Sequence, residues 1–260
     1  MKSSKKRLKI RLRRCGEKMS EDAYKILDYL PYSYKTKQEQ VYIEFLWDSF
    51  ESNYKNQKFQ FALIPFHMLF MSAVYFDIWK IKINNQNDFE KALIGLRKED
   101  EKIMSEASWP FTFSKINESH IFRFLKLINF DNCKIGNFCK VVDDRNSVAH
   151  SNGNIFVQAQ ESLDSKISEI LRCIEDIAEH SKHLIKNIFQ NFLLENWNVD
   201  ERENLDDKEQ IRQLLIQRSY FNSKDIKFCL NFDIRTLQEK QHYAEMSSLF
   251  DSFKSSYADA

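Results

Sequence analysis

The sequence has few of the residues that end strands and form tight turns, with four glycines and three prolines among 260 residues. A sheet protein of this length needs many such turns, so their scarcity argues against sandwich and barrel architectures. Phe, Ile, Leu and Lys recur instead at the three- and four-residue spacing of amphipathic helices. We therefore expect an all-α fold, a bundle of long helices with a C-terminal helical extension.

The cysteines do not indicate a disulfide framework. Their number, five, is odd, and no two are spaced as a CxxC pair. Free thiols are typical of a reducing compartment, and residues 15–30 contain no apolar run like that of a signal peptide. We therefore expect a cytoplasmic protein. The cysteines are Cys15, Cys133, Cys139, Cys173 and Cys229.

Acidic residues are missing from the beginning of the chain. Residues 1–14 carry eight Lys or Arg and no Asp or Glu, which leaves 31 basic against 38 acidic residues in the rest, a net charge of −7. Such a block is typical of a solvated tail, and attraction to nucleic acid is the alternative. We expect residues 1–14 to be poorly ordered without RNA or a partner. The acidic remainder argues against a protein that coats nucleic acid along its whole surface.

One long apolar run, residues 59–81, is a candidate for a membrane-spanning helix or a buried core helix. It is interrupted by Gln60, Pro65, His67 and Asp77. Polar and ionisable groups are costly in a bilayer, so the pattern favours a core helix and no membrane partner. His67 is then expected to be a hydrogen-bonded core histidine.

The helical pattern divides the chain into three parts. A basic tail covers residues 1–20, a helical bundle covers residues 21–197, and a linker with a C-terminal helical appendage covers residues 198–260. The longest periodic run predicts one helix from Ser162 to Asn196, roughly 50 Å long at 1.5 Å per residue. Its apolar stripe is typical of a seam within a bundle, and a dimer seam is the alternative. The stripe consists of Leu163, Ile167, Ile170, Ile174, Ile177, Leu184, Ile188 and Phe192, with one lapse at Ser181.

Most motifs of the common enzyme classes are absent. The chain has no P-loop, GxGxxG, GxSxG or HExxH motif. His180 and His183 have a spacing that can bind a metal, but no cysteine or carboxylate pair nearby completes a zinc site. Cys133 and Cys139 with His150 match no common metal pattern either. We expect neither a metal nor another cofactor.

The segment DDRNSVAHSNGN, residues 143–154, is the one place where residues suited to phosphate chemistry gather. An arginine grips phosphate oxygens with its planar guanidinium, and a histidine transfers protons near neutral pH. Asn146 can hydrogen-bond a phosphate or orient the imidazole. The candidate catalytic residues are Arg145, Asn146 and His150.

A purely structural interpretation of the same residues stays open. In it, Arg145 pairs with Asp143 or Asp144, Asn146 belongs to the turn, and His150 ends the helix, where the helix dipole stabilises its charged form.

The stretch RNSVAH, residues 145–150, resembles the motif of the HEPN superfamily, an Arg followed after four to six residues by a His, often with a polar residue directly after the Arg. The architecture that this resemblance covers is residues 35–197. It implies a HEPN-like helical bundle, a homodimeric paired site and metal-independent cleavage of RNA. Many members are toxins of toxin–antitoxin systems or effectors of antiviral defence and abortive infection, and others are inactive modules that bind RNA or a protein partner.

The chemistry of RNA cleavage adds a geometric condition. An in-line attack by the ribose 2′-OH needs a base and an acid on opposite sides of the phosphorus, and one histidine cannot occupy both places. A two-fold dimer would supply two. On an ideal helix Arg145 and His150 point about 140° apart, so we expect the helix to end before His150 or each residue to meet another partner.

Three hypotheses follow from the sequence. The first is a HEPN-type endoribonuclease acting as a homodimer on RNA, controlled by an antitoxin or a defence-system partner. The second is an inactive HEPN-like module, and the third is an unrelated helical interaction protein. Under the first, replacing Arg145 or His150 is expected to abolish cleavage and to leave stability within about 1 kcal/mol.

Overall fold

The computed structural model describes residues 21–150 and 153–259, and the expectation for residues 1–14 lies outside them. The described residues contain helices and no strand, with one isolated bridge between Pro31 and Asn222. The prediction of an all-α fold is therefore confirmed. The elements are η1 (Glu21–Asp28), α2 (Lys37–Lys55), α3 (Phe59–Asn84), α4 (Gln86–Ala92), α5 (Lys98–Glu106), η2 (Pro110–Lys115), α6 (Glu118–Ile121), η3 (Phe122–Ile128), α7 (Asn132–Ala149), α8 (Gln160–Glu195), η4 (Val199–Glu201), α9 (Asp207–Gln210), the π-helical η5 (Ile211–Gln217), α10 (Ser223–Leu230), η6 (Ile234–Leu237) and α11 (Tyr243–Tyr257).

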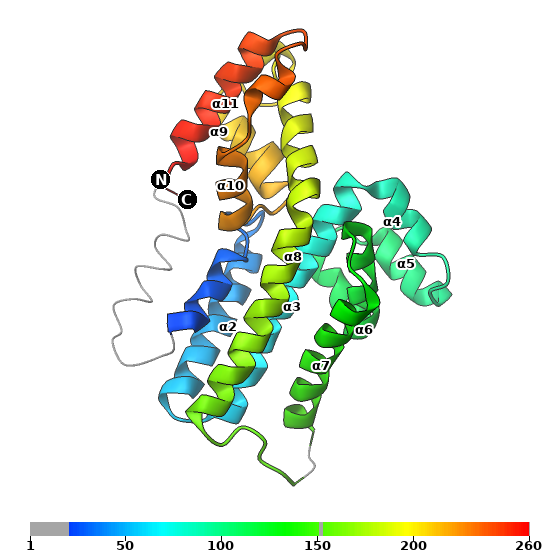
Figure 1. The fold of residues 1–260 in the computed structure, drawn as a ribbon, viewed down its shortest axis with the longest axis vertical. Coiled ribbons are helices and arrows are strands. Elements are labelled where there is room, and N and C mark those ends of the chain that lie inside the picture. The colour runs from blue at the N-terminus through cyan, green and yellow to red at the C-terminus, as the bar shows by residue number, and fades with distance from the viewer. Residues whose placement is uncertain (1–20, 151–152, 260) are drawn as a thin grey trace.

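Helices α2, α3 and α8 lie side by side and form the centre of the fold (Figure 1). Helix α2 begins with a capping box, in which Thr36 accepts the backbone N–H of Glu39 and the Glu39 side chain accepts that of Thr36. Helix α3 is long and apolar enough to span a membrane, but 83% of its most apolar window is buried inside the fold. That burial is what the interrupted run 59–81 predicts for a core helix.

Helix α8 is a single helix of 36 residues, as the periodic run predicts. Its apolar stripe packs within the chain, the part through Ile177 against α3, α7 and η1 and the part with Ile188 and Phe192 against the C-terminal helices. The stripe is therefore a seam between helices of one chain. Ser181, the lapse in the stripe, is buried as well. Helices α4 to α7 and the short elements between them cover one side of this centre (Figure 1).

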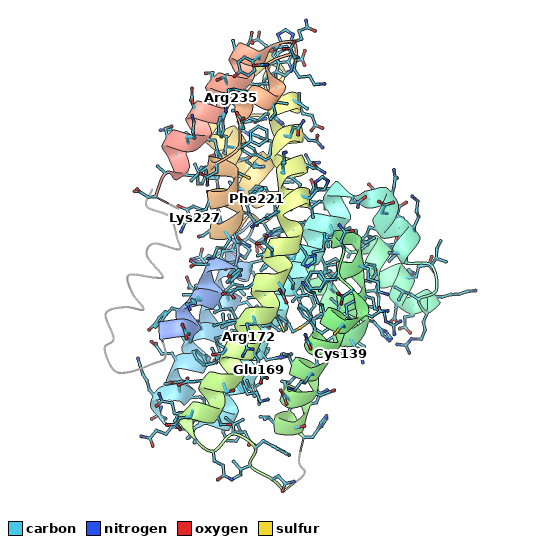
Figure 2. The ribbon with its side chains drawn as sticks, in the orientation of Figure 1. Cys139, Glu169, Arg172, Phe221, Lys227 and Arg235 are labelled. Carbon is cyan, nitrogen blue, oxygen red and sulfur yellow. The ribbon has the colours of Figure 1, made fainter. Side chains whose placement is uncertain are left out.

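The C-terminal helices form a second apolar cluster around the far end of α8. This cluster contains Ile185, Phe189 and Leu193 of α8 together with apolar side chains of η5, α10 and α11. Several contacts join the C-terminal helices to the rest of the fold, and two of them show how. Tyr32 donates its backbone N–H to the carbonyl of Phe221 (2.8 Å), a buried residue labelled in Figure 2, and Lys80 of α3 pairs with Asp225 of α10.

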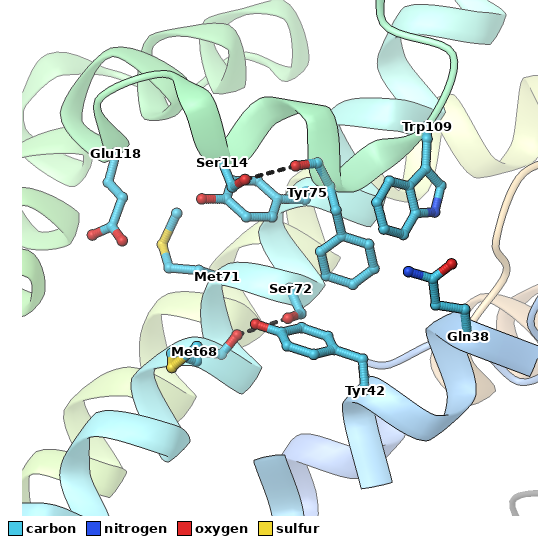
Figure 3. A pocket seen from close by; sticks show the side chains of 10 residues that line it. Gln38, Tyr42, Met68, Met71, Ser72, Tyr75, Trp109, Ser114 and Glu118 are labelled. Carbon is cyan, nitrogen blue, oxygen red and sulfur yellow. Dashed lines mark hydrogen bonds between the residues drawn. The ribbon is translucent and has the colours of Figure 1, made fainter. Parts of the chain in front are cut away.

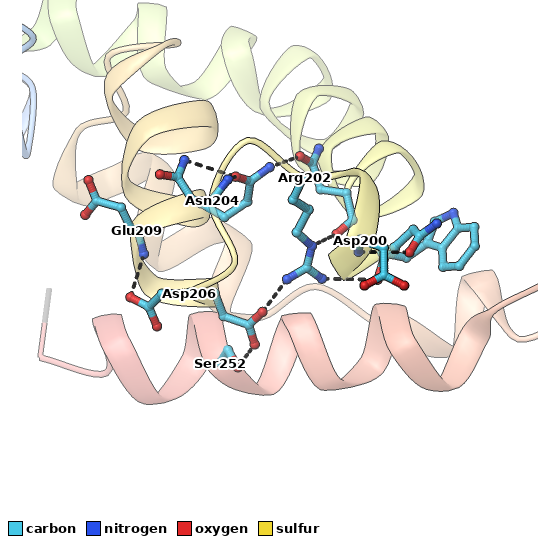
Figure 4. Close-up of polar contacts among 11 residues, drawn as sticks. Asp200, Arg202, Asn204, Asp206, Glu209 and Ser252 are labelled. Carbon is cyan, nitrogen blue, oxygen red and sulfur yellow. Dashed lines mark hydrogen bonds and ion pairs between the residues drawn. The ribbon is translucent and has the colours of Figure 1, made fainter.

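The acidic segment 198–208, predicted as a linker, is a folded connection held by the side chain of Arg202 (Figure 4). The side chain of Arg202 is 3% exposed, and its guanidinium donates to the carbonyls of Asn196 and Trp197 and pairs with Asp207. Asp207 in turn accepts a hydrogen bond from Ser252 of α11 (2.6 Å). The connection therefore fastens the end of α8 to the last helix.

Candidate functional site

Helix α7 ends one residue before His150. The carboxylate of Asp131 caps its first turn by accepting the backbone N–H of Lys134 (2.8 Å), and the helix continues to Ala149. His150 takes an extended conformation (φ −91°, ψ 145°) while its backbone N–H still bonds the carbonyl of Asn146 (3.1 Å). Its side chain is exposed. The helix therefore ends before His150, which is one of the two outcomes that the geometric condition allows.

Arg145 points toward Glu118, the first residue of α6. Its Nη2 lies 2.6 Å from Oε2 of Glu118, and the two side chains are 26% and 19% exposed. The Nε of Arg145 is buried and makes no hydrogen bond to the described residues. Arg145 therefore already holds one oxyanion, and its guanidinium has donor capacity to spare.

Glu118 also joins Arg145 to His67, a residue of α3 that is 1% exposed. His67 Nε2 lies 3.1 Å from the same Oε2 atom. A carboxylate oxygen only accepts, so Nε2 carries the proton, and the buried Nδ1 is left as an acceptor with no partner among the described residues. The prediction of a hydrogen-bonded core histidine is confirmed.

The charge state of this cluster follows from burial and from Arg145. Burial lowers the pKa of His67 more than Glu118 raises it, so His67 is neutral near pH 7. Burial opposes the charge of Glu118 too, but the hydrogen bonds from His67 and Arg145 and the charge of Arg145 together lower its pKa. We assign the charged partner role to Arg145, which stays protonated in proteins. The cluster is thus one carboxylate shared by a neutral donor and a cation.

One part of the purely structural interpretation of residues 143–150 is wrong and another part is confirmed. Arg145 pairs with Glu118, so a pairing with Asp143 or Asp144 is wrong; Asp144 instead bonds Lys166 of α8 (2.7 Å) and Asp143 is exposed. The position of His150 at the helix end is confirmed. Within the described residues, no hydrogen bond connects the side chains of Arg145, Asn146 and His150 to one another, and Asn146 is half-buried. One chain therefore presents the three residues on the last turn of α7 without joining them.

Sequence reasoning missed Glu118 and a cavity of about 380 Å³ that it closes at one end (Figure 3). Helix α3 forms the floor of this cavity, α2 one wall, and the segment from Trp109 to Ser114 the other. The Trp-Pro pair at 109–110 predicts a helix break but not a wall. The cavity is lined by Gln38, Tyr42, Met68, Met71, Ser72, Tyr75, Trp109, Phe111, Ser114 and Glu118.

The histidines and cysteines weighed as metal ligands have other surroundings. His180 contacts Lys134 through Nε2 (2.8 Å) and the carbonyl of Ile128 through Nδ1 (3.2 Å). Cys133 is exposed and Cys139 half-buried, both as free thiols. In the part of the chain that the structure describes, no three His, Cys, Asp or Glu side chains gather in a way that could hold a metal.

Acid is expected to destabilise the fold through His67. Because burial lowers its pKa below 6.5 in the folded chain, the unfolded chain takes up a proton at a higher pH. The free energy of unfolding should therefore fall as the pH drops below 6.5, and the fall should end when the pH reaches the lowered pKa of His67. The loss is about 1.4 kcal/mol for each pH unit of that interval. Glu118, whose pKa is lowered, adds a further loss below pH 4.5.

Urea unfolding at several pH values measures this effect, with His67→Gln as the test variant. Glutamine can still donate to Glu118 but does not titrate, so the decline between pH 6.5 and the lowered pKa of His67 should flatten. His183→Gln is the matched control because His183 is exposed. An unchanged decline in His67→Gln would show that another group causes it.

Comparison with known proteins gives no relative from which a function could be transferred. No family model matches the chain, no curated protein is significantly similar to it, and no solved structure matches it.

Proposed function

We propose that this chain is a HEPN-type endoribonuclease that cleaves RNA without a metal ion, acting as a homodimer and serving as a toxin or antiviral effector. The observation that carries the proposal is the end of α7 at Ala149, which leaves His150 exposed directly after the turn that bears Arg145 and Asn146. An exposed imidazole and a partly exposed guanidinium on one helix end suit an incoming phosphate.

In the proposed reaction the 2′-oxygen of a ribose forms a bond to the neighbouring phosphorus while the bond from phosphorus to the 5′-oxygen breaks. The 2′-OH proton passes to the imidazole of one His150, and the His150 of a second copy protonates the leaving 5′-oxygen. Arg145 stabilises the charge on the non-bridging oxygens, and Asn146 hydrogen-bonds the phosphate or orients the imidazole. The products are a 2′,3′-cyclic phosphate and a 5′-hydroxyl.

The ion pair between Arg145 and Glu118 favours a second candidate, an inactive module that binds RNA or a protein partner. A phosphate must share Arg145 with the carboxylate or displace it, and the 2.6 Å contact makes that competition strong. The partial exposure of Arg145, 26% of its side chain, supports sharing, because the guanidinium can keep Glu118 on Nη2 and receive a phosphate on another N–H.

The purified chain incubated with single-stranded RNA and excess EDTA separates these candidates. Under the proposed mechanism RNA is cut, the fragments carry 2′,3′-cyclic phosphate ends, and DNA of the same sequence stays intact because it lacks the attacking hydroxyl. Activity per chain should fall on dilution below the dimer dissociation constant. Cleavage that stops with EDTA, or that cuts DNA equally, would contradict the mechanism, and intact RNA throughout would favour the inactive module.

A further inference from the structure

The cavity beside Arg145 has an aromatic wall and a polar edge. Tyr42 and Trp109 each contact Phe111, with ring centroids 5.2 and 5.0 Å apart. The indole N–H of Trp109 donates to the buried carboxylate of Glu39 (2.7 Å), which fixes the ring in place. A flat ligand in the cavity therefore meets aromatic side chains whose positions are already set by the fold.

Several polar groups in the same cavity are available to a ligand. The hydroxyls of Tyr42 and Tyr75 and the amide of Gln38 make no hydrogen bond to other described residues. Glu118 uses Oε2 for both His67 and Arg145, so its Oε1 is available as an acceptor. In Figure 3, Glu118 lies at one end of the cavity, with Gln38 and Trp109 at the other. An apolar ligand would leave these groups without partners, which is costly in a half-buried site.

We propose that this cavity holds an unstacked base of single-stranded RNA, and that Glu118 selects bases with an exocyclic amino group. The cavity volume of about 380 Å³ lies within the roughly 300–1,000 Å³ of ligand pockets. Single-stranded RNA is recognised by stacking its bases on aromatic side chains and by hydrogen bonds to their edges. A carboxylate oxygen accepts from the amino group of adenine, cytosine or guanine, and uracil has no such group.

The position of Arg145 links the cavity to a phosphate. Glu118 lines the cavity and bonds Arg145 directly, so a base in the cavity and a phosphate on Arg145 are one side chain apart. That the base belongs to an RNA strand rests on the proposed function, whereas the fit of a base stands on the cavity alone. A free nucleotide has the same chemistry, and the experiment below distinguishes the two sources.

Calorimetric titration of the His150→Ala chain tests the proposal without cutting the RNA. The probes are adenosine, cytidine and uridine homopolymers of about ten nucleotides, and the corresponding free nucleoside monophosphates. We expect the adenosine and cytidine strands to bind more tightly than the uridine strand. Strands should bind more tightly than monophosphates, since a strand adds backbone contacts; equal affinity would assign the cavity to free nucleotides and overturn the RNA assignment.

Two variants test the place of binding. Tyr75→Phe removes a hydroxyl that has no hydrogen-bond partner among residues 21–150 and 153–259, and it should weaken binding about three- to tenfold. Met68→Trp fills the rim of the cavity, where Met68 is 38% exposed, and should abolish binding. The matched controls make the same kinds of change outside the cavity. Tyr243→Phe removes a tyrosine hydroxyl, and Phe61→Trp places a tryptophan at an exposed position of α3. Circular dichroism and thermal unfolding check that each variant is folded.

The outcomes separate this proposal from the nuclease. Binding that Met68→Trp abolishes, in a chain whose unsubstituted form leaves RNA uncut, supports the base site and contradicts the nuclease. Cleavage by the unsubstituted chain, with RNA bound equally by Met68→Trp and Tyr75→Phe, contradicts the base site and supports the nuclease. A uridine strand that binds as tightly as the others overturns selection by Glu118, and no saturable binding of any probe overturns the whole proposal.

Discussion

Replacing Lys80 with methionine is expected to lower the free energy of unfolding by about 3–5 kcal/mol. Lys80 is 1% exposed, and its Nζ lies 2.7 Å from a carboxylate oxygen of Asp77 and 2.7 Å from one of Asp225. Burial opposes its charge, but the carboxylates of Asp225 and Asp77 together raise the pKa of Lys80. Without the ammonium group, two buried carboxylates would face each other with no cation. Urea unfolding measures the loss.

The aspartates provide the sharpest control for Lys80→Met. Changing Asp77 and Asp225 to Asn in the same chain removes the uncompensated charge and should restore about 2 kcal/mol or more. Lowering the pH should also narrow the deficit of Lys80→Met, because burial raises the pKa of Asp77 and protonation then favours the folded chain. Lys91→Met, which removes an exposed ion pair with Asp88, should cost no more than about 1 kcal/mol. A loss from Lys80→Met as small as this would show that the buried contact contributes little.

His150→Ala is expected to abolish RNA cleavage, with the cleavage rate lowered at least about 100- to 10,000-fold. The free energy of unfolding should stay within about 1 kcal/mol of that of the unsubstituted chain, as measured by thermal unfolding. The reason is that the imidazole is exposed at the end of α7 and supports no part of the core, yet in the proposed reaction it moves both protons. His183→Ala, another exposed histidine, is the control. Full cleavage by His150→Ala would remove His150 from the mechanism.

Replacing Arg145 is expected to lower the stability of the fold more than replacing His150 does. The sequence predicts that its replacement costs little stability, but the structure gives it an ion pair with a carboxylate that is 19% exposed. Arg145→Ala would leave Glu118 with only a neutral donor, at a cost of about 1–3 kcal/mol. Arg145→Lys keeps the positive charge and loses the planar fork of donors. The cleavage rate of Arg145→Lys, compared with its free energy of unfolding, therefore tests phosphate binding better than Arg145→Ala does.

The sequence predicts best what depends on neighbouring residues. The spacing of Thr36 and Glu39 indicates a capping box and the periodic apolar run predicts the single helix α8, and the structure contains both. The apolar spacing of Ile121, Phe122, Leu125 and Ile128 also indicates a helix, but there α6 gives way to the 3₁₀ turns of η3 and Asn129 takes a left-handed conformation. Local spacing thus predicts where a helix forms, but it does not distinguish an α-helix from 3₁₀ turns.

Contacts between distant residues are the part that the sequence does not predict. Arg145 has two aspartates directly before it, yet its partner is 27 residues away, and Lys80 pairs with a residue 145 positions later. Both partners are set by how the helices pack, which no local pattern encodes. For the candidate site, Arg145, Asn146 and His150 are predictable as a motif, whereas Glu118 and the cavity depend on the arrangement of α2, α3 and α6.

The first half of helix α8 packs in the central apolar cluster and its second half packs in the C-terminal cluster. One continuous helix is therefore part of both clusters. Ile185, Phe189 and Leu193 are buried in the cluster that the C-terminal helices form. A protease cut or a partner that pulled residues 198–257 away would expose this stretch, and the helix would shorten from that end. The C-terminal helices thus set the length over which α8 is buried.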